Sequence, residues 1–405
     1  MTCRLTATLA LLALSAAGCG RSESSGGGAA KGGTLKIGAA LSLTGSLTKE
    51  GNLTKQGYQH CQQVVNSKGG VNAGGKSYRL AITYADDKSE PDTAGQLVDR
   101  FNDQGIKLVL GPYGSPSTEA AAAVVEKNGQ VMVDSSGADN NIFSKGYRQT
   151  FAVLSPATTY AKVMIEAVAS EAKPKPKSVV FLSADDGFSK TVTKGGTEEA
   201  QRQGMKVLGT ETFPEKSTDV SAAVNKAKSL NPDLVVGSVH VVEGIAIIKQ
   251  SKELGLKPAG GFAETVAPPT PDFTSTLGGS AEGVLGSTQW VPQVKGEDKY
   301  FGTAQDYAAS FKKRFGSDAE YHSAEAAAAC LALVLGTEKA GSTEPAKVRD
   351  GIARLDSPSF FGPIKFDSTG LNVTKPMSVI QIQGGKPVTV FPKDQQQSPL
   401  KWPAQ

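Results

Sequence analysis

Residues 111–118, Gly-Pro-Tyr-Gly-Ser-Pro-Ser-Thr, are of the types that bind an anion. They connect an apolar run that ends at Leu110 to an alanine-rich stretch. Ser115 is suited to be the N-cap of a helix there, and Pro116 to be its first residue, because that position needs no amide proton. The free amides of the first turn, the helix dipole and the serine hydroxyls would then hold a carboxylate. The alternative is a capped helix without a ligand.

Two more polar features follow apolar runs. Residues 134–140, Asp-Ser-Ser-Gly-Ala-Asp-Asn, come directly after a predicted strand and could supply further hydrogen-bond donors. The alternative there is a polar turn. Glu264 follows the short run 259–262, and a carboxylate at the end of a strand can pair with an ammonium group. The alternative is a glutamate that faces water.

The usual metal-binding and nucleophile motifs are missing. The sequence contains no His-Glu-x-x-His, no Cys-x-x-Cys and no Gly-x-Ser-x-Gly. Its three histidines, His60, His240 and His322, are not spaced to bind a metal. We therefore predict that the protein is not an enzyme and needs no cofactor. An enzyme that assembles its nucleophile from distant residues remains the alternative, and turnover of a bound ligand would reveal it.

The N-terminus has the pattern of an export signal. Arg4 precedes the apolar run 5–14, which is too short to span a bilayer, and small residues lead to Cys19. These small residues resemble the bacterial lipobox, whose cysteine is acylated, although Ala16 stands where leucine is usual. We predict a signal peptide at 1–18 and, at 19–33, a lipidated cysteine with a flexible tether. An ordinary secretory signal with a chance cysteine is the alternative.

The predicted location is therefore outside the cytoplasm, on the outer face of the cytoplasmic membrane or in the periplasm. The chain meets the membrane only through its lipid, since no later apolar run approaches spanning length. With 43 basic and 39 acidic side chains, its charge is too balanced to predict a nucleic-acid surface. Cys61 and Cys330 could form a disulfide in this compartment or remain two buried thiols.

The 405 residues are enough for two domains, and β-branched runs alternate with amphipathic stretches. This alternation predicts an α/β protein of two Rossmann-like lobes, with a ligand cleft where the carboxyl ends of parallel strands meet. Strands are predicted at 35–41, 78–85, 108–110, 131–133, 178–182, 206–213, 234–236, 284–289, 364–366, 378–382 and 387–390. Helices are predicted at 52–68, 92–104, 117–128, 158–171, 189–204, 220–229, 243–254, 302–315, 323–339 and 345–355.

Several short segments, in their order and spacing, resemble the leucine/isoleucine/valine-binding family of ABC-transporter solute receptors, which has the type I periplasmic-binding fold. The likeness runs from about Leu35 to Val390, nearly the whole mature chain. The segments are Leu-Lys-Ile-Gly at 35–38, Ser-Leu-Thr-Gly at 42–45, Asn-Ser-Lys-Gly-Gly-Val at 66–71, Tyr-Ala-Asp-Asp at 84–87, Val-Leu-Gly-Pro at 109–112 and Phe-Gly-Pro-Ile-Lys-Phe-Asp at 361–367.

The resemblance implies two lobes that close on a small ligand and are joined by crossings near Leu154, Ser287 and Pro376. The implied bounds are 34–154 plus 288–376 for lobe 1 and 155–287 plus 377–405 for lobe 2. The same resemblance implies that a membrane permease and its separate ATPase are the partners. A binding protein that signals to a membrane receptor is the alternative, because the same fold serves both roles.

The resemblance also implies ligand-binding roles for particular residues. In the first lobe, Tyr113, Gly114 and Ser115 contact the carboxylate of an amino acid, and Ser136 and Gly137 share that task. In the second lobe the implied residues are Glu264 for the ammonium group, Phe188 in place of a tyrosine that packs on the ligand, and His240 at or beside an aromatic position.

Two departures from the family pattern bear on the ligand. Ala138 stands where a threonine hydroxyl usually helps to bind the carboxylate, and Glu50 stands where an aromatic residue is common. An added acidic group, together with the imidazole of His240, suits a polar or cationic ligand better than leucine. We therefore predict an amino acid, or a related amide or amine-bearing compound, rather than a strictly aliphatic ligand.

Overall fold

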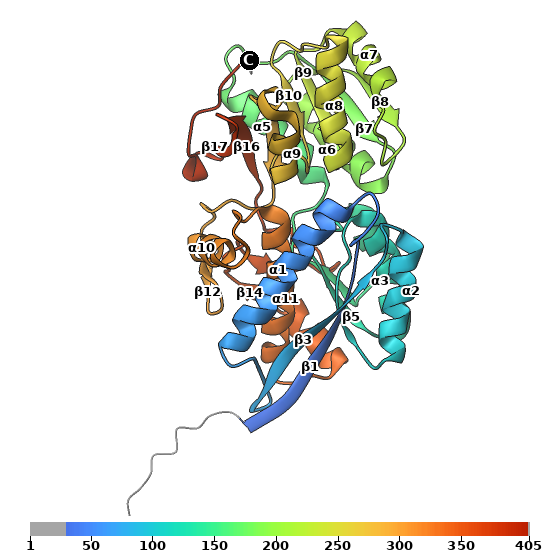
Figure 1. The fold of residues 1–405 in the computed structure, drawn as a ribbon, viewed down its shortest axis with the longest axis vertical. Helices are drawn as coiled ribbons and strands as arrows, with labels where there is room; N and C mark the ends of the chain where they lie inside the picture. The colour runs from blue at the N-terminus through green and yellow to red at the C-terminus, as the bar shows by residue number, and fades with distance from the viewer. Residues whose placement is uncertain (1–29, 404–405) are drawn as a thin grey trace, which may run out of the picture.

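The computed structural model describes residues 30–403, which form two halves that lie one above the other in Figure 1. The predicted signal peptide, Cys19 and most of the predicted tether lie outside the described residues. The end of the predicted tether is instead part of a strand. β1 (Ala30–Leu41) begins at Ala30 because its first residues pair with β3 (Lys76–Asp86).

The first half, in the lower part of Figure 1, is built on a six-stranded sheet in the order β2-β3-β1-β4-β5-β6. Its other strands are β2 (Val71–Ala73), β4 (Leu108–Leu110), β5 (Val131–Asp134) and β6 (Thr150–Ala152). Its helices are α1 (Thr48–Ser67), α2 (Pro91–Asp103), α3 (Ser115–Asn128), α4 (Asn140–Phe143), α10 (Ala304–Phe315), α11 (Tyr321–Ala340) and α12 (Pro345–Ala353). Helices α1, α11 and α12 bury one face of the sheet, and α2 and α3 cover the other. Two short strand pairs lie beside it, β12 (Glu297–Asp298) with β13 (Gly302–Thr303) and β14 (Asp356–Ser357) with β15 (Ile364–Lys365).

The second half contains a seven-stranded sheet in the order β17-β16-β11-β10-β9-β7-β8. Its strands are β7 (Ser178–Ala184), β8 (Lys206–Phe213), β9 (Leu234–Ser238), β10 (Phe262–Glu264), β11 (Leu285–Thr288), β16 (Ser378–Gln383) and β17 (Lys386–Phe391). Its helices are α5 (Thr158–Glu171), α6 (Gly187–Arg202), α7 (Ser221–Leu230), α8 (Val241–Leu254) and α9 (Pro271–Leu277), with short 3₁₀ turns η1 (Gly278–Ala281) and η2 (Lys393–Gln395). Helices α5 and α6 pack on one face and α7, α8 and α9 on the other.

The predicted α/β class with parallel sheets is confirmed. Strands β1 and β3 to β6 are parallel to one another, and so are β7 to β11. In the two large sheets the exceptions are β2, β16 and β17, which pair antiparallel, and the short pairs β12–β13 and β14–β15 are antiparallel as well. Strands β16 and β17 are joined by Gly384 and Gly385, both at positive φ, and such a two-residue turn can connect only antiparallel neighbours.

The chain passes between the halves after β6, after β11 and before β16, and a ring of buried hydrogen bonds joins these three crossings. The Ser155 amide donates to Oε1 of Gln289 at 3.0 Å, and Nε2 of Gln289 donates to the Ser155 carbonyl at 3.1 Å. The Ser155 hydroxyl donates to the Lys375 carbonyl at 2.8 Å, and the Lys375 ammonium donates back to the Gln289 carbonyl. We call Ser155, Gln289 and Lys375 the hinge ring. The predicted bounds divide the chain into two lobes that move relative to each other, and this division remains a prediction.

A disulfide joins the two long helices of the first half. Cys61 on α1 and Cys330 on α11 are both fully buried and bonded at 2.06 Å. Of the two alternatives that the sequence left open, the structure has the bridge. It links residues 269 positions apart, so it holds the N-terminal helix of the first half against the segment that returns after the second crossing.

Candidate functional site

The candidate residues of both halves lie at or just after the carboxyl ends of parallel strands. Tyr113, Gly114 and Ser115 follow β4; Ser136, Gly137 and Ala138 follow β5; Phe188 follows β7; His240 follows β9; Glu264 ends β10; and Glu50 lies in the first turn of α1, after β1. Open parallel sheets bind ligands at this edge. The arrangement therefore collects the predicted residues at the boundary between the halves.

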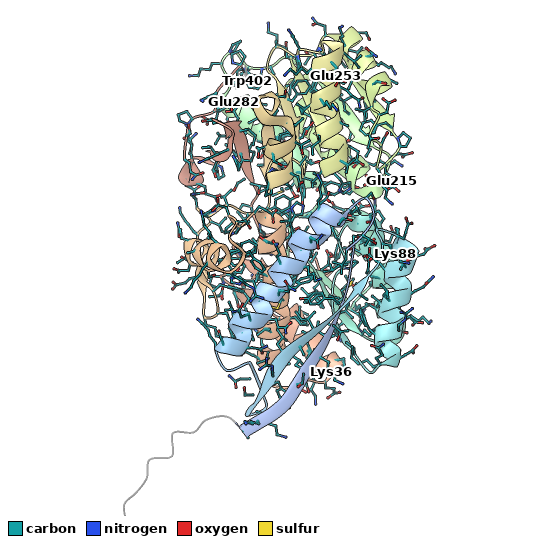
Figure 2. All side chains as sticks on the ribbon, viewed as in Figure 1. Lys36, Lys88, Glu215, Glu253, Glu282 and Trp402 are labelled. Atoms are coloured by element: carbon teal, nitrogen blue, oxygen red, sulfur yellow. A yellow bond between two sulfur atoms is a disulfide. The ribbon has the colours of Figure 1, made fainter. Side chains whose placement is uncertain are left out.

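The halves are in contact at this boundary, so the cleft is closed. The amide of Val241, at the start of α8, donates to Oε1 of Glu50 on α1 at 3.3 Å. A cavity of only about 30 Å³ remains nearby, with walls from both halves. Figure 2 shows the side chains around the boundary, with Lys88 of the first half and Glu215 of the second labelled at its outer edge.

The predicted capping role of Ser115 is wrong. Gly114 is the N-cap of α3, with φ 85° and ψ 149°, and Ser115 and Pro116 are the first two helical residues. A side chain would be strained at this positive φ, so glycine suits the cap better than serine. The Ser115 hydroxyl instead accepts a hydrogen bond from the amide of Asp139 at 3.1 Å. Because a hydroxyl can accept and donate at once, its proton is still available to a carboxylate.

The turn after β5 uses its donors within the protein. The Ser136 hydroxyl donates to the Pro112 carbonyl at 2.9 Å and accepts from the Gly114 amide at 3.1 Å. The Gly137 amide donates to the Asp134 carboxylate at 2.8 Å. These contacts fix the turn against the loop that leads into α3. Direct binding of a ligand by Ser136 or Gly137 stays a prediction.

Glu264 carries a carboxyl group without a partner. Its side chain is fully buried, and within residues 30–403 neither of its oxygens has a hydrogen-bond partner. Burial raises the pKa of this carboxyl well above its ordinary value. Gly244 makes room for it, because a Cβ there would lie 2.8 Å from Oε2 of Glu264. A buried, unpaired carboxyl group of this kind can bind an ammonium group.

His240 forms an ion pair with Asp186 beside the ring of Phe188. Its Nε2 lies 3.8 Å from Oδ2 of Asp186, and its ring centroid lies 5.3 Å from that of Phe188. Burial alone would lower the pKa of His240, but contact with Asp186 and the charges of Glu243 and Glu50 raise it to about 9. The imidazole is therefore positively charged at neutral pH. In the described part of the chain its Nδ1 has no hydrogen-bond partner.

Glu50 is buried at the same boundary. One carboxylate oxygen accepts from Val241, whereas Oε2 finds no partner in the described chain. Burial raises the pKa of Glu50, and a hydrogen bond from its own backbone and the charges of His240 and His322 reduce that rise. An acidic residue therefore does lie here, next to the imidazole.

Sequence reasoning missed several residues at this boundary. The Tyr113 hydroxyl lies 3.4 Å from Nε2 of His322, whose Nδ1 lies 2.6 Å from the carboxylate of Glu320. Tyr160 packs edge-on against Phe188, with ring centroids 5.1 Å apart. The one local signal was a polar pair, Glu320 and His322, at the start of an alanine-rich helix. Its relation to Tyr113 depends on packing between segments 209 residues apart.

A phosphate-binding pattern in the sequence was also missed. Residues 70–77, Gly-Val-Asn-Ala-Gly-Gly-Lys-Ser, have the spacing Gly-x₄-Gly-Lys-Ser of such a loop. The structure forms a β2–β3 hairpin there, with Gly74 and Gly75 at positive φ in the turn. A phosphate-binding loop instead connects a strand to the N-terminus of a helix, so this match does not make a nucleotide site.

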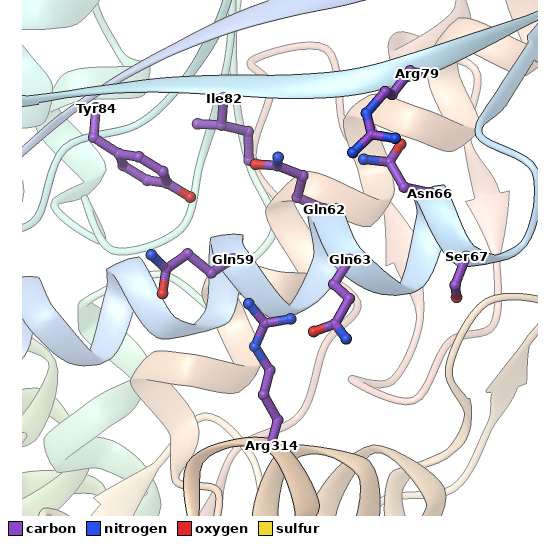
Figure 3. Close-up of a pocket in the computed structure, with 9 residues that line it drawn as sticks. All are labelled: Gln59, Gln62, Gln63, Asn66, Ser67, Arg79, Ile82, Tyr84 and Arg314. Carbon is purple, nitrogen blue, oxygen red and sulfur yellow. The ribbon is translucent and has the colours of Figure 1, made fainter.

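A second hollow, of about 610 Å³, lies on the surface of the first half between α1, β3 and α10 (Figure 3). Its walls carry side-chain amides and the exposed guanidinium groups of Arg79 and Arg314, and they include none of the predicted ligand residues. Within residues 30–403, no three His, Cys, Asp or Glu side chains gather to hold a metal ion. No helix in that range combines the length and apolar character needed to cross a bilayer.

Comparisons with known proteins agree with this geometry. The family model described as "Periplasmic binding protein" matches residues 34–387. A leucine-, isoleucine-, valine-, threonine- and alanine-binding protein of Pseudomonas aeruginosa is 24% identical, covering 76% of this chain and 78% of the relative. Among solved structures, the leucine binding protein LivK of Thermotoga maritima superposes with a TM-score of 0.78 at 20% identity, covering 88% of this chain and 97% of that one. The branched-chain amino acid transporter substrate binding protein LivJ of Streptococcus pneumoniae, in complex with isoleucine, gives 0.76 at 21% identity, with coverages of 88% and 99%.

The two sheets, the three crossings and the cleft between facing strand ends define a protein of the solute-binding class. The chain belongs to the periplasmic binding protein family, and the expected kinship with leucine/isoleucine/valine-binding proteins is confirmed. Its curated relatives are binding proteins rather than enzymes.

Proposed function

We propose that this chain is the extracytoplasmic solute-binding lipoprotein of an ABC importer, and that it binds an amino acid or a related amide or amine compound between its lobes. The unpaired, fully buried carboxyl group of Glu264 carries this proposal. Leaving such a group unpaired is costly, and a ligand ammonium would remove that cost. On the other half, the Ser115 hydroxyl retains a proton for the ligand carboxylate.

The binding cycle follows from the three crossings. Without ligand the lobes separate about the crossings, and a ligand that bridges Ser115 and Glu264 favours the closed form by its contacts in both lobes. The closed protein then docks on a membrane permease, and a separate ATPase drives release. The lipid on Cys19 keeps the protein near that permease.

The ligand is polar or cationic rather than aliphatic. The relatives' names concern leucine, isoleucine and other small amino acids, and those names describe the relatives. In this chain the buried boundary holds the extra carboxyl group of Glu50 and the charged imidazole of His240. An aliphatic side chain placed against these groups would leave Oε2 of Glu50 and Nδ1 of His240 without partners, at a free-energy cost.

Calorimetry on the purified protein with leucine, arginine, glutamine and urea tests the ligand class. We expect arginine or glutamine to bind more tightly than leucine. Tight binding of leucine alone would refute the polar-ligand proposal. If none of the four compounds gave a heat of binding, the proposal of an amino-acid ligand would be refuted.

Lipidation is tested separately, in cells fed a labelled fatty acid. We expect the label in the wild-type protein and its absence from Cys19→Ser. Label retained in Cys19→Ser would contradict lipidation at this residue.

A further inference from the structure

Glu325 is a buried carboxyl group that the sequence did not assign to the cleft. It lies on α11, one helical turn after Tyr321, and only 1% of its surface is exposed. Within residues 30–403 its Oε2 has no hydrogen-bond partner. An ionised carboxylate in such a place needs a cation or several donors to offset its lost hydration.

The nearby ammonium group of Lys375 does not supply those donors. An ammonium group has three protons. That of Lys375 already donates to the Gln289 carbonyl, to Oε1 of Gln289 at 3.3 Å and to the Pro376 carbonyl at 3.2 Å. Burial and the charges of Glu320 and Asp134 raise the pKa of Glu325, and Lys375 only partly opposes them. Oε2 of Glu325 therefore still lacks a donor within the described residues, and a ligand ammonium group could supply one.

Glu325 lies one helical turn after His322 on α11, and residues three apart lie on the same face of a helix. Nε2 of His322 lies 3.4 Å from the hydroxyl of Tyr113. Burial raises the pKa values of Tyr113, in the first half, and of Tyr160, in the second, and the charge of Glu325 raises both further. Tyr160 also packs on Phe188, and the Tyr113 ring lies 6.3 Å from that of His240. Glu325 thus shares the face of α11 that His322 presents to the candidate site.

The two acidic positions, Glu264 first and Glu325 second, belong to different halves of the protein, because Glu264 ends β10 and Glu325 lies on α11. Burial alone raises the pKa of Glu264, without a contribution from another charge. Glu325 responds to the charges of its neighbours, and so does Glu50, which also has an unpartnered oxygen in the described chain. A ligand with one ammonium group can serve Glu264 but not the second position. A neutral side chain would leave that second position unpaired.

We propose that Glu325 is a specificity-determining residue that receives a positively charged group on the ligand side chain, so that the ligand is a basic amino acid or a close diamino relative. This proposal rests on the proposed function, because it assumes that Glu264 takes the α-ammonium group. Beyond that function, the ligand carries a second positive charge, and Glu325 is the residue that selects for it.

Calorimetry at pH 7 with lysine and norleucine tests the proposal, because norleucine is lysine without its side-chain ammonium group. In the wild-type protein we expect lysine to bind at least about tenfold more tightly, the effect of one charged hydrogen bond. Glu325→Gln, which keeps the side-chain shape, is expected to reduce that ratio about tenfold or more. Glu325→Asp keeps the charge and is expected to retain part of the preference.

Glu344→Gln is the matched control, since Glu344 is exposed and should leave the ratio unchanged. A wild-type protein that binds norleucine as tightly as lysine would overturn the assignment, and so would an unchanged ratio in Glu325→Gln. If that variant unfolds, the wild-type ratio and Glu325→Asp decide. Binding of leucine or norleucine but not lysine refutes this inference and the polar-ligand proposal but leaves the amino-acid-binding function in place, whereas binding of no amino acid refutes that function as well.

Discussion

Replacing Glu264 with glutamine removes one charge from the closed cleft while keeping the side-chain shape. The wild-type carboxyl group is fully buried, and neither oxygen has a partner in the described chain. A ligand ammonium group therefore does not compete with protein donors for it. The loss should lie near the top of the range for a charged hydrogen bond, about 2–3 kcal/mol. The dissociation constant of an amino acid should then rise about 30- to 150-fold.

The assay is calorimetry with an amino acid and with the matching carboxylic acid that lacks the α-ammonium group. We expect Glu264→Gln to raise the dissociation constant of the amino acid by about 30- to 150-fold and to leave that of the matching carboxylic acid almost unchanged. Glu253→Gln, on the exposed side of α8 and labelled in Figure 2, is the control and should bind both as the wild type does. Equal losses for both ligands, or unchanged affinity for the amino acid, would refute the assignment of Glu264 to the ammonium group.

The same variant tests the pKa of Glu264 without a ligand. Glu264 packs against Gly237 and Gly244 of its own half, so separation of the lobes leaves these contacts in place. Burial raises the pKa of Glu264 above 4.5, so the unfolded chain ionises at a lower pH than the folded protein does. The contribution of Glu264 to the free energy of unfolding is therefore present below pH 4.5 and is lost as pH rises towards the raised pKa. Urea unfolding between pH 4 and pH 8 should show that Glu264→Gln lacks this loss. Parallel pH profiles for the two proteins would contradict the buried state of the carboxyl group.

Three further predictions concern other contacts. Ser115→Ala should weaken ligand binding by about 1–3 kcal/mol, because a ligand carboxylate would lose a donor; calorimetry with unchanged affinity would exclude the hydroxyl from the site. The ion pair of His240 and Asp186 should stabilise the fold fully below pH 6.5 and progressively less as pH rises through about 9, the raised pKa of His240. In urea unfolding from pH 6 to pH 10, Asp186→Asn should show a flatter dependence of the free energy of unfolding on pH. Replacing both Cys61 and Cys330 with alanine should lower the free energy of unfolding by about 2–5 kcal/mol, and a melting temperature equal to that of the wild type would argue against a stabilising bridge.

Most long elements could be predicted because their patterns repeat several times. The predicted helix 158–171 and strand 206–213 have the same bounds as α5 and β8. β6 has three residues and α4 has four, too few for a period to show, and neither was predicted, whereas the equally short β4 was, because its residues Leu-Val-Leu are all apolar. Local chemistry alone also misplaced the start of α3, because serine is a common cap but the chain turns there at a positive φ that favours Gly114.

The candidate site was partly predictable, since polar residues after strand ends meet at one edge of a sheet. That rule led to Glu264 and to the loop around Ser115. It could not find Glu325, which lies inside a run of alanines in α11. Nor could spacing decide the bridge between Cys61 and Cys330, because it depends on how α1 and α11 pack.

The hinge ring lets the overall strength of ligand binding differ without a change in which ligands are preferred. Because Ser155, Gln289 and Lys375 each bond to another crossing, hydrogen bonds tie the three connections to one another. In the proposed binding cycle, a change at Ser155 would alter how readily the cleft shuts without altering the groups that face the guest. Evolution or design could therefore scale the strength of capture for every solute by the same factor and leave the order of preference intact.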